Sequence, residues 1–294
     1  MMKTYILFLF LILTSVMVSA QQLPVLSQYM YNRMYYNPAY AGSNEQTSAS
    51  LLHRSQWLGV KGSPNTQLFS IDAPVGKNVG LGLNLANDRS GVTSQTDVLG
   101  SFSYNLGGSG LSFGLRAGIS YYSARLTNVF IIEQGDPVFS DNVKSAILPK
   151  FGAGAYYSND QFYLGVSVPD LIVYDQSGIF DSPDRKTANI RSNYIAFGGI
   201  KTNISPAIQF EPSLLIKHHY AYPLLIHLNG TFHLNEWLSA GAGYRVNNAF
   251  TGIIQLKLID KLKMGYSFDV YQPNVRLGYL NSHEIMLSYN LGLD

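Results

Sequence analysis

The chain has 294 residues, enough for one large β domain or two small ones, and 13% of them are charged, about half the usual share. A formal net charge of +2 excludes the strongly basic surface that nucleic-acid binding requires. The lack of cysteine excludes disulfides, thiolate metal sites, cysteine nucleophiles and a lipid-modified N-terminal cysteine.

Residues 1–20 have the pattern of a cleaved signal peptide. Lys3 supplies the positive start, Tyr5–Val18 is mostly apolar, and the small residues up to Ala20 favour cleavage before Gln21. A membrane anchor is the alternative, but this apolar run is shorter than the ~20 residues that a spanning helix needs. Because no later segment reaches that length, we expect membrane insertion to occur as a β-barrel.

Residues 21–46 are rich in tyrosine and show neither strand alternation nor a helical stripe. Pro38 biases Asn37 toward an extended conformation, and Gly42 permits backbone angles that other residues avoid. The segment is either a periplasmic lead-in to the first strand, or a plug that folds under or into the barrel and helps form a partner site. Tyrosine and asparagine suit the second role, since they offer rigid apolar surface with polar tips. The residues expected to carry it are Tyr29, Tyr31, Asn32, Tyr36, Asn37, Pro38, Tyr40 and Gly42.

Residues 47–294 read as a succession of strands in one domain. The run 262–270 is apolar at every even position and polar or glycine at every odd one, and 224–234 and 111–121 alternate in the same way. The predicted strands are 47–57, 65–75, 79–89, 94–106, 110–126, 149–158, 161–170, 191–204, 207–219, 223–234, 236–247, 249–259, 261–271 and 283–293.

The lengths of these strands and of their connections favour an outer-membrane barrel. Strands of soluble sandwiches average about 5–6 residues. Most of the predicted strands instead have the length of outer-membrane strands, which is about 9–11 residues. The longest connections, 127–148, 171–190 and 272–282, all follow odd-numbered strands, and connections after even-numbered strands are short. We therefore predict an all-β fold, a transmembrane antiparallel β-barrel of fourteen strands with both termini periplasmic.

Charged residues in the predicted strands fall on the polar faces, which point into the lumen of such a barrel. A charge that faces lipid would cost about 2–4 kcal/mol at mid-membrane. The mixed signs of these charges favour ion pairs or contact with a plug, and a water-filled channel is the alternative. Trp57 is either a residue of the aromatic girdle or part of the rim, and Arg54 is a candidate lumen anchor. The expected lumen or rim residues are Arg54, Gln56, Trp57, Arg116, Glu211, Arg245 and Asp269.

The sequence contains no complete catalytic or metal-binding pattern. His283-Glu284 starts like a zinc-protease motif, but Leu287 stands where the second histidine would be. No Gly-x-Ser-x-Gly elbow and no phosphate-binding loop occur. We expect no enzyme activity, no cofactor, no metal and no nucleic-acid partner.

Several stretches, taken in chain order, resemble one protein family. They are Gln28–Asn32, Asn37–Ser43, Arg54–Gln67, Lys150–Tyr157, Phe162–Pro169, Gly243–Arg245, Met264–Asp269 and Ser282–Ile285. Together they resemble the PorP/SprF family, outer-membrane proteins associated with the type IX secretion system of Bacteroidetes.

The resemblance implies a non-enzymatic protein of the outer membrane that docks or anchors secreted surface proteins. The implied cargo is a large adhesin with a type-B C-terminal domain, and the implied links run to gliding machinery or to a periplasmic secretion or peptidoglycan-binding component. The alternative is a passive outer-membrane channel or a transporter of hydrophobic substrates. A barrel enzyme acting on lipids would need a Ser/His/acid set, which this sequence does not supply.

Overall fold

The structure is a computed structural model that describes residues 25–44, 46–125, 143–174, 188–189, 192–219, 222–272 and 280–292. Side chains are described for these residues except 143–146, 173–174, 188–189 and 222. The predicted signal peptide, residues 1–20, lies outside the described residues. No helix among them is long and apolar enough to cross a membrane.

The first half of the wall is an antiparallel meander in which each strand pairs with the next along the chain. Polar turns with positive-φ glycines, such as Gly76 (φ +80°), form the shorter connections between these strands. The strands are β1 (Thr47–Gln56), β2 (Asn65–Pro74), β3 (Val79–Ser90), β4 (Thr93–Asn105), β5 (Leu111–Ala124), β6 (Val143–Ser158) and β7 (Phe162–Val168).

The second half continues in the same manner after β7. Its strands are β10 (Tyr194–Ile200), β11 (Thr202–Ser205), β12 (Ile208–His219), β13 (Tyr222–Leu234), β14 (Leu238–Arg245), β15 (Ala249–Ile259), β16 (Leu262–Tyr271) and β17 (Asn281–Leu291). Strands β10 and β11 both pair with β12, so they form one wall strand interrupted at Lys201.

The wall closes because β1 pairs with β17, from Thr47 opposite Leu291 to Gln56 opposite Ser282. With β10 and β11 counted as one, the barrel has fourteen strands, which confirms the prediction. The pairing of β1 with β17 means that neither of these two strands is a free sheet edge, which a strand exposed to lipid could not tolerate. Strands β8 (Val173–Tyr174) and β9 (Ala188–Asn189), each two residues long, pair with each other and form a sheet separate from the wall. The sequence predicts a loop at these positions.

The predicted strand positions agree with the wall to within a few residues at most ends, and β7 is an informative difference. We expected it to run to residue 170, but it ends at Val168. Pro169 has no backbone N–H to donate to a neighbouring strand. The chain then turns, and the Leu171 N–H donates to the Phe151 carbonyl at 2.7 Å.

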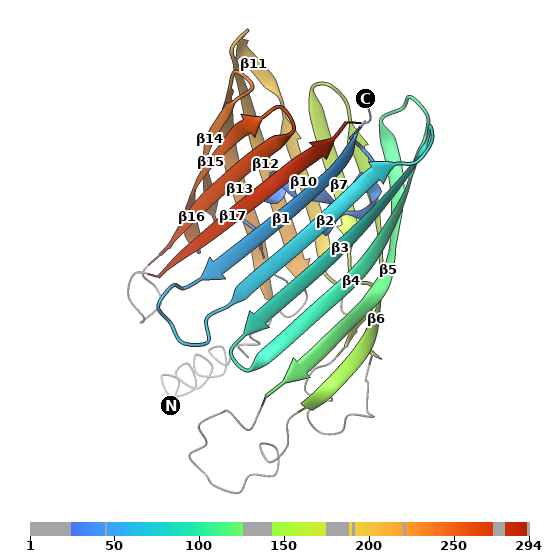
Figure 1. The fold of residues 1–294 in the computed structure, drawn as a ribbon, viewed down its shortest axis with the longest axis vertical. Helices are drawn as coiled ribbons and strands as arrows, with labels where there is room; N and C mark the ends of the chain where they lie inside the picture. The colour runs from blue at the N-terminus through green and yellow to red at the C-terminus, as the bar shows by residue number, and fades with distance from the viewer. Residues whose placement is uncertain are drawn as a thin grey trace, which may run out of the picture.

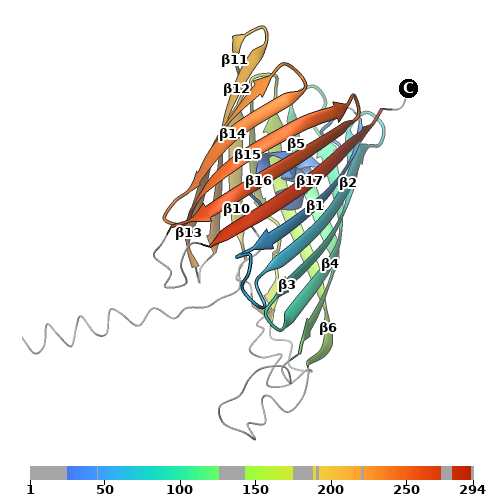
Figure 2. The same cartoon turned by 60° about the vertical axis from the view of Figure 1, so that its left-hand side comes forward.

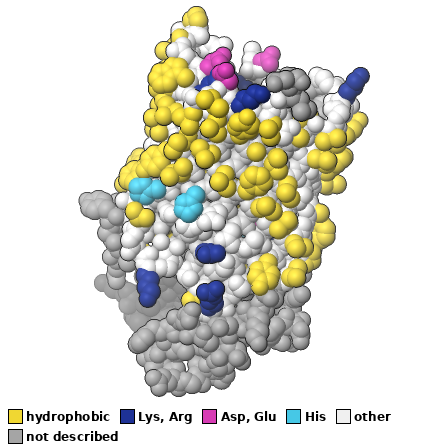
Figure 3. Space-filling view, viewed as in Figure 1, with side chains coloured by type: hydrophobic (Ala, Val, Ile, Leu, Met, Phe, Trp, Pro, Cys, Tyr) yellow, Lys and Arg dark blue, Asp and Glu magenta, His cyan; other side chains and the backbone are white. Residues whose placement is uncertain are grey.

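The two-residue period places apolar side chains outside and polar ones inside. On β5, Leu115 and Ile119 are exposed to 64% and 47%, whereas the residues that directly follow them, Arg116 and Ser120, are buried at 4% and 1%. Figure 3 shows hydrophobic side chains spread over the wall, with the acidic side chains of this face gathered near one end. This alternation matches a wall that faces lipid and a polar lumen.

The two ends of the barrel differ in their connections (Figure 1). The end at which β1 begins and β17 ends is here called the short-turn end, and it carries compact turns such as 75–78 and 260–261. The opposite long-loop end carries the longest connections of the chain. That the short-turn end faces the periplasm stays a prediction.

Three single-turn helices precede the wall and lie within the barrel, as Figure 2 shows for the first described part of the chain. They are η1 (Tyr29–Tyr31), α2 (Arg33–Tyr36) and η2 (Pro38–Tyr40). Their apolar residues form the main buried cluster together with inward-facing residues of the wall, including Leu52 and Phe197. The hydrophobic core of this protein is therefore inside the barrel.

Candidate functional site

Residues Val25–Gly42, here called the plug, fill part of the lumen and are held in short turns by local chemistry. The Asn37 Oδ1 accepts from the Ala39 N–H at 2.9 Å, and Pro38 stands at the first position of η2, where no N–H is needed. Gly42 has φ +66°, and a Cβ there would lie 2.6 Å from the Gly80 Cα. The plug therefore leaves the lumen through a turn that only glycine fits.

The wall makes room for the plug at Gly114 of β5. A Cβ at this position would collide with backbone atoms of Ala39 and Pro38. Because backbone cannot move aside as a flexible side chain can, this glycine sets the distance between plug and wall.

A buried ion network, here called the clamp, holds the beginning of the plug. Arg54 contacts Asp269 at 2.6 Å and Glu284 at 3.1 Å, and all three side chains are at most 1% exposed. The Ser27 hydroxyl donates to Asp269 and accepts from Arg54, while the backbone N–H groups of Ser27 and Gln28 donate to Glu284. Of the two carboxylates that share this arginine, Glu284 thus accepts from backbone donors of the plug and Asp269 from the Ser27 hydroxyl.

A second arginine, Arg116 of β5, binds the plug and forms no ion pair with a carboxylate among the described side chains. Its guanidinium donates to the carbonyls of Met34 and Tyr35. Nearby, the Ser167 hydroxyl donates to the Tyr36 carbonyl at 2.7 Å. These contacts satisfy carbonyl groups that a four-residue helix leaves unpaired at its end.

The side of the plug that faces β12 is held by Arg33 and Tyr29. Arg33 contacts Glu211 at 3.3 Å and lies 3.6 Å above the ring of Tyr163, whose hydroxyl also donates to Glu211. Burial raises the pKa of the Tyr29 phenol to about 12, so it stays protonated and donates to the Ser213 hydroxyl at 3.0 Å.

The plug runs from the long-loop side of the lumen to the short-turn end. Ser27 contacts Arg54 and Glu284, which lie within four residues of the long-loop ends of β1 and β17. Gly42 donates to Asp72, close to the short-turn end of β2. The sequence left two alternatives for this segment, a periplasmic lead-in to the first strand or a plug that folds under or into the barrel; its first described residues lie deep in the lumen.

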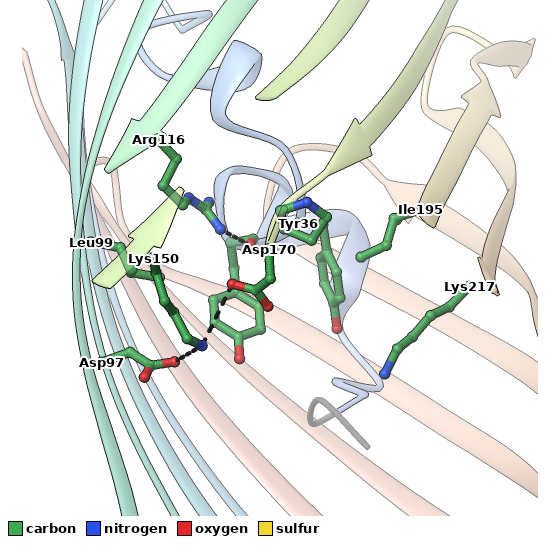
Figure 4. Close-up of a pocket in the computed structure, with 10 residues that line it drawn as sticks. Tyr36, Asp97, Leu99, Arg116, Lys150, Asp170, Ile195 and Lys217 are labelled. Atoms are coloured by element: carbon green, nitrogen blue, oxygen red, sulfur yellow. Dashed lines mark hydrogen bonds and ion pairs between the residues drawn. The ribbon is translucent and has the colours of Figure 1, made fainter. Parts of the chain in front are cut away.

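A cavity lined by charged and apolar groups lies on the long-loop side of the plug (Figure 4). Lys150 bridges two carboxylates, Asp97 at 2.9 Å and Asp170 at 3.5 Å. Arg116 and Lys217 also line the cavity, and Lys217 lies across it from Lys150. The lumen charges are thus of mixed sign, which does not resemble a permeation filter built from rings of one charge.

The structure brings most of the predicted residues together. Tyr29, Asn32, Tyr36, Asn37 and Pro38 are buried within the plug against the wall. The residues Tyr31, Tyr40 and Gly42 are partly exposed. Their expected role in binding a partner stays a prediction.

The predicted lumen and rim residues fall into several groups. Arg54 and Asp269 form the clamp, and Arg245 adds a contact of 3.6 Å to Asp269. Arg116 and Glu211 hold the plug as described above. Gln56 donates to the Tyr271 hydroxyl, and Trp57 packs with its ring 6.3 Å from that of Tyr271, so both lie at the inner rim of the long-loop end.

Sequence reasoning missed Ser27, Arg33 and Glu284 as contact residues of the plug. In the sequence, Glu284 stands out only as half of an incomplete zinc motif and as part of a family-like stretch. The signal that could have found it was present, because Ile285 and Leu287 face outward and so place Glu284 on the inner face with Asp269. No group of three or more potential metal ligands occurs among the described side chains.

A closed antiparallel barrel with an apolar outer wall and a polar, plugged lumen defines an outer-membrane β-barrel protein. The family model described as type IX secretion system membrane protein PorP/SprF matches residues 18–289. The chain belongs to this family, and its location is the outer membrane. No curated protein matches the chain.

Solved structures of low sequence identity share the fold. A FadL homologue of Pseudomonas aeruginosa matches with TM-score 0.51 and 11% identity over 88% of this chain and 94% of that one. The CymD monoaromatic hydrocarbon channel matches with TM-score 0.53 and 9% identity over 93% and 95%. The TodX deltaS2S3 mutant, also a monoaromatic hydrocarbon channel, matches with TM-score 0.52 and 10% identity over 88% and 94%. At these identities the likeness concerns the fold alone.

Proposed function

We propose that this protein is a plugged, non-conducting barrel that docks a type IX-secreted surface protein and links it to the secretion or gliding machinery. The cargo is a large adhesin-like protein with a type-B C-terminal domain, which binds at the long-loop end. A component on the short-turn side, in the periplasm, supplies the link.

The observation that carries this proposal is the way in which the plug is held. Buried ion pairs at Arg54, the carbonyl contacts of Arg116 and the Arg33–Glu211 pair fix the plug to widely separated strands of the wall. A diffusion channel gains nothing from a lumen filled in this manner. A docking protein gains a rigid, closed body from which both mouths can be recognised.

The long-loop end is the mouth proposed for cargo. Gln56 and Trp57 form part of its inner rim, where aromatic and polar side chains suit protein recognition. The family's association with type IX secretion supports a secreted partner. Neither the family nor the fold suggests an enzyme.

Purification from native outer membranes in mild detergent tests the proposal. We expect a large secreted protein to co-purify with the tagged barrel and to be lost when the cargo's C-terminal domain is deleted. Recovery of the barrel alone after crosslinking would contradict docking. Discrete conductance of the full chain in planar bilayers without cargo would favour the channel that the fold neighbours represent.

A further inference from the structure

A polar hollow opens between the plug and the wall near the short-turn end. Arg33, Tyr40 and Asn44 line it from the N-terminal segment, and Tyr163 and Lys201 line it from the wall. It is separate from the cavity around Lys150, with which it shares no lining residue. We call it the mouth site.

The mouth site offers positive charge and hydrogen-bond donors. Two cations, Arg33 and Lys201, line it, and no carboxylate does so among the described residues. Glu211 lies behind Arg33 and holds it in place, but the Arg33 Nε is buried without a hydrogen-bond partner in the described structure. An acceptor-rich, negatively charged group is what this lining would bind.

Aromatic rings give the mouth site fixed walls. The ring of Tyr40 meets that of Tyr156 edge-on at 5.3 Å, and Arg33 lies above the ring of Tyr163 at 3.6 Å. Such packing restricts the guanidinium in the free protein, so that ordering this side chain costs little conformational entropy when a ligand binds. Rigid tyrosines beside a cation are typical of sites that bind a protein segment.

The mouth site is composite, because the plug supplies one side and the wall the other. If the plug left the lumen, Arg33 and Tyr40 would leave with it, and only the wall residues would remain. A partner that binds here therefore also recognises that the plug is seated.

We propose that the mouth site binds an acidic side chain on a segment of a protein located at the short-turn side. This inference rests on the proposed linking function and names the chemistry by which the link is made. Away from the mouth site on the same end, the turns near Lys257 expose Glu236 and Asp260, which disfavour the approach of an acidic segment there. Lys201, which lines the mouth site, would attract it.

The absence of cysteine from the chain permits a clean crosslinking test. Asn44, which is exposed and lines the site, is replaced in Asn44→Cys and labelled in isolated outer membranes with a benzophenone maleimide. We expect one discrete protein adduct on the affinity-purified barrel, with Asp or Glu in the crosslinked partner peptide. Lys77→Cys, on an exposed turn of the same end outside the site, should give no such adduct.

Charge changes then decide whether the contact is the proposed one. Lys201→Glu should reduce the yield of the adduct at least ten-fold, and Lys77→Glu should leave it unchanged. When the identified acidic residue of the partner is replaced by Lys, the adduct should form again with the Lys201→Glu variant. No adduct, a lipid adduct, a partner segment without acidic residues, or an adduct insensitive to Lys201→Glu would each overturn the inference. Cargo co-purification in the same membranes separates the outcomes: retained cargo without the adduct refutes the mouth site alone.

Discussion

The two ends of the plug are held in different ways. At the clamp, Ser27 is buried completely among Arg54, Asp269 and Glu284, none of which is more than 1% exposed. At the mouth site, the Arg33 side chain keeps 15% exposure and borders an open hollow. The same segment is therefore inaccessible at one end and open to a partner at the other.

This difference separates stability from recognition. Buried charges are costly unless each one is paired, so the clamp tolerates no change and presents nothing to a partner. The mouth site keeps part of its bonding capacity unused, which is a requirement for binding. Changes at the clamp should therefore alter stability, and changes at the mouth site should alter partner binding.

The largest effect is expected from deletion of residues 25–42. The wall closes through β1–β17 pairing without help from the plug, so the barrel should still insert in the membrane. The emptied lumen should give discrete conductance in planar bilayers where the full chain gives none, and the partner should no longer be retained. A deletion variant that shows no conductance, or one that still retains its partner, would show that the plug is only a lead-in to the first strand.

A single change in the clamp should have the next largest effect. Arg54→Met leaves the carboxylates of Asp269 and Glu284 buried beside each other, which should cost about 3–5 kcal/mol of unfolding free energy. Urea unfolding followed by the loss of compact gel mobility measures this cost. Arg89→Met, at an exposed position near the end of β3, is the matched control and should change little. A loss below about 1 kcal/mol for Arg54→Met would contradict the clamp.

A smaller effect is expected where the plug backbone meets the wall. Gly114→Ala places a methyl group against Ala39, and overpacking of this kind costs about 1–3 kcal/mol. The same unfolding assay measures it, together with protease sensitivity of the plug. Gly252→Ala, which adds a methyl group with nothing within 4 Å, is the control. Equal stability of both variants would show that the plug is not seated against β5.

The smallest effect is expected at the exposed counterpart of the clamp. Lys257, like Arg54, faces two acids, Glu236 at 3.2 Å and Asp260 at 3.1 Å, but these acids are 88% and 96% exposed. Solvent screens such pairs, so Lys257→Ala should cause no measurable change in unfolding by urea. A loss comparable with that of Arg54→Met would mean that burial is not what distinguishes the two networks.

The strands could be predicted from the sequence because their information is local. A two-residue period needs only a few neighbouring residues to be recognised, and every predicted strand corresponds to a strand of the wall. Even the inward direction of Arg116 and Asp269 followed from this alternation. The interruption at Lys201 and the hairpin β8–β9 were missed, since no period marks them.

The contacts of the plug could not be predicted in this way. Ser27 meets Asp269 across 242 positions in the chain, and Arg33 meets Glu211 across 178. No periodicity connects such pairs, and turns without a repeated pattern give no register from which to place them. Tyrosine richness indicated a segment suited to interfaces, but not which surfaces it would contact.

The sequence by itself determined the barrel, because alternation, strand length and turn spacing are properties of consecutive residues, and it also pointed to the PorP/SprF family. Only the tertiary structure decided that the plug reaches from the clamp to the mouth site, with one end buried and one end open. The physical reason is that closing the wall brings distant strands around a single lumen. The charges on those strands then pair with one another across the wall, as Arg54 does with Asp269, and with groups of the plug, as Glu211 does with Arg33.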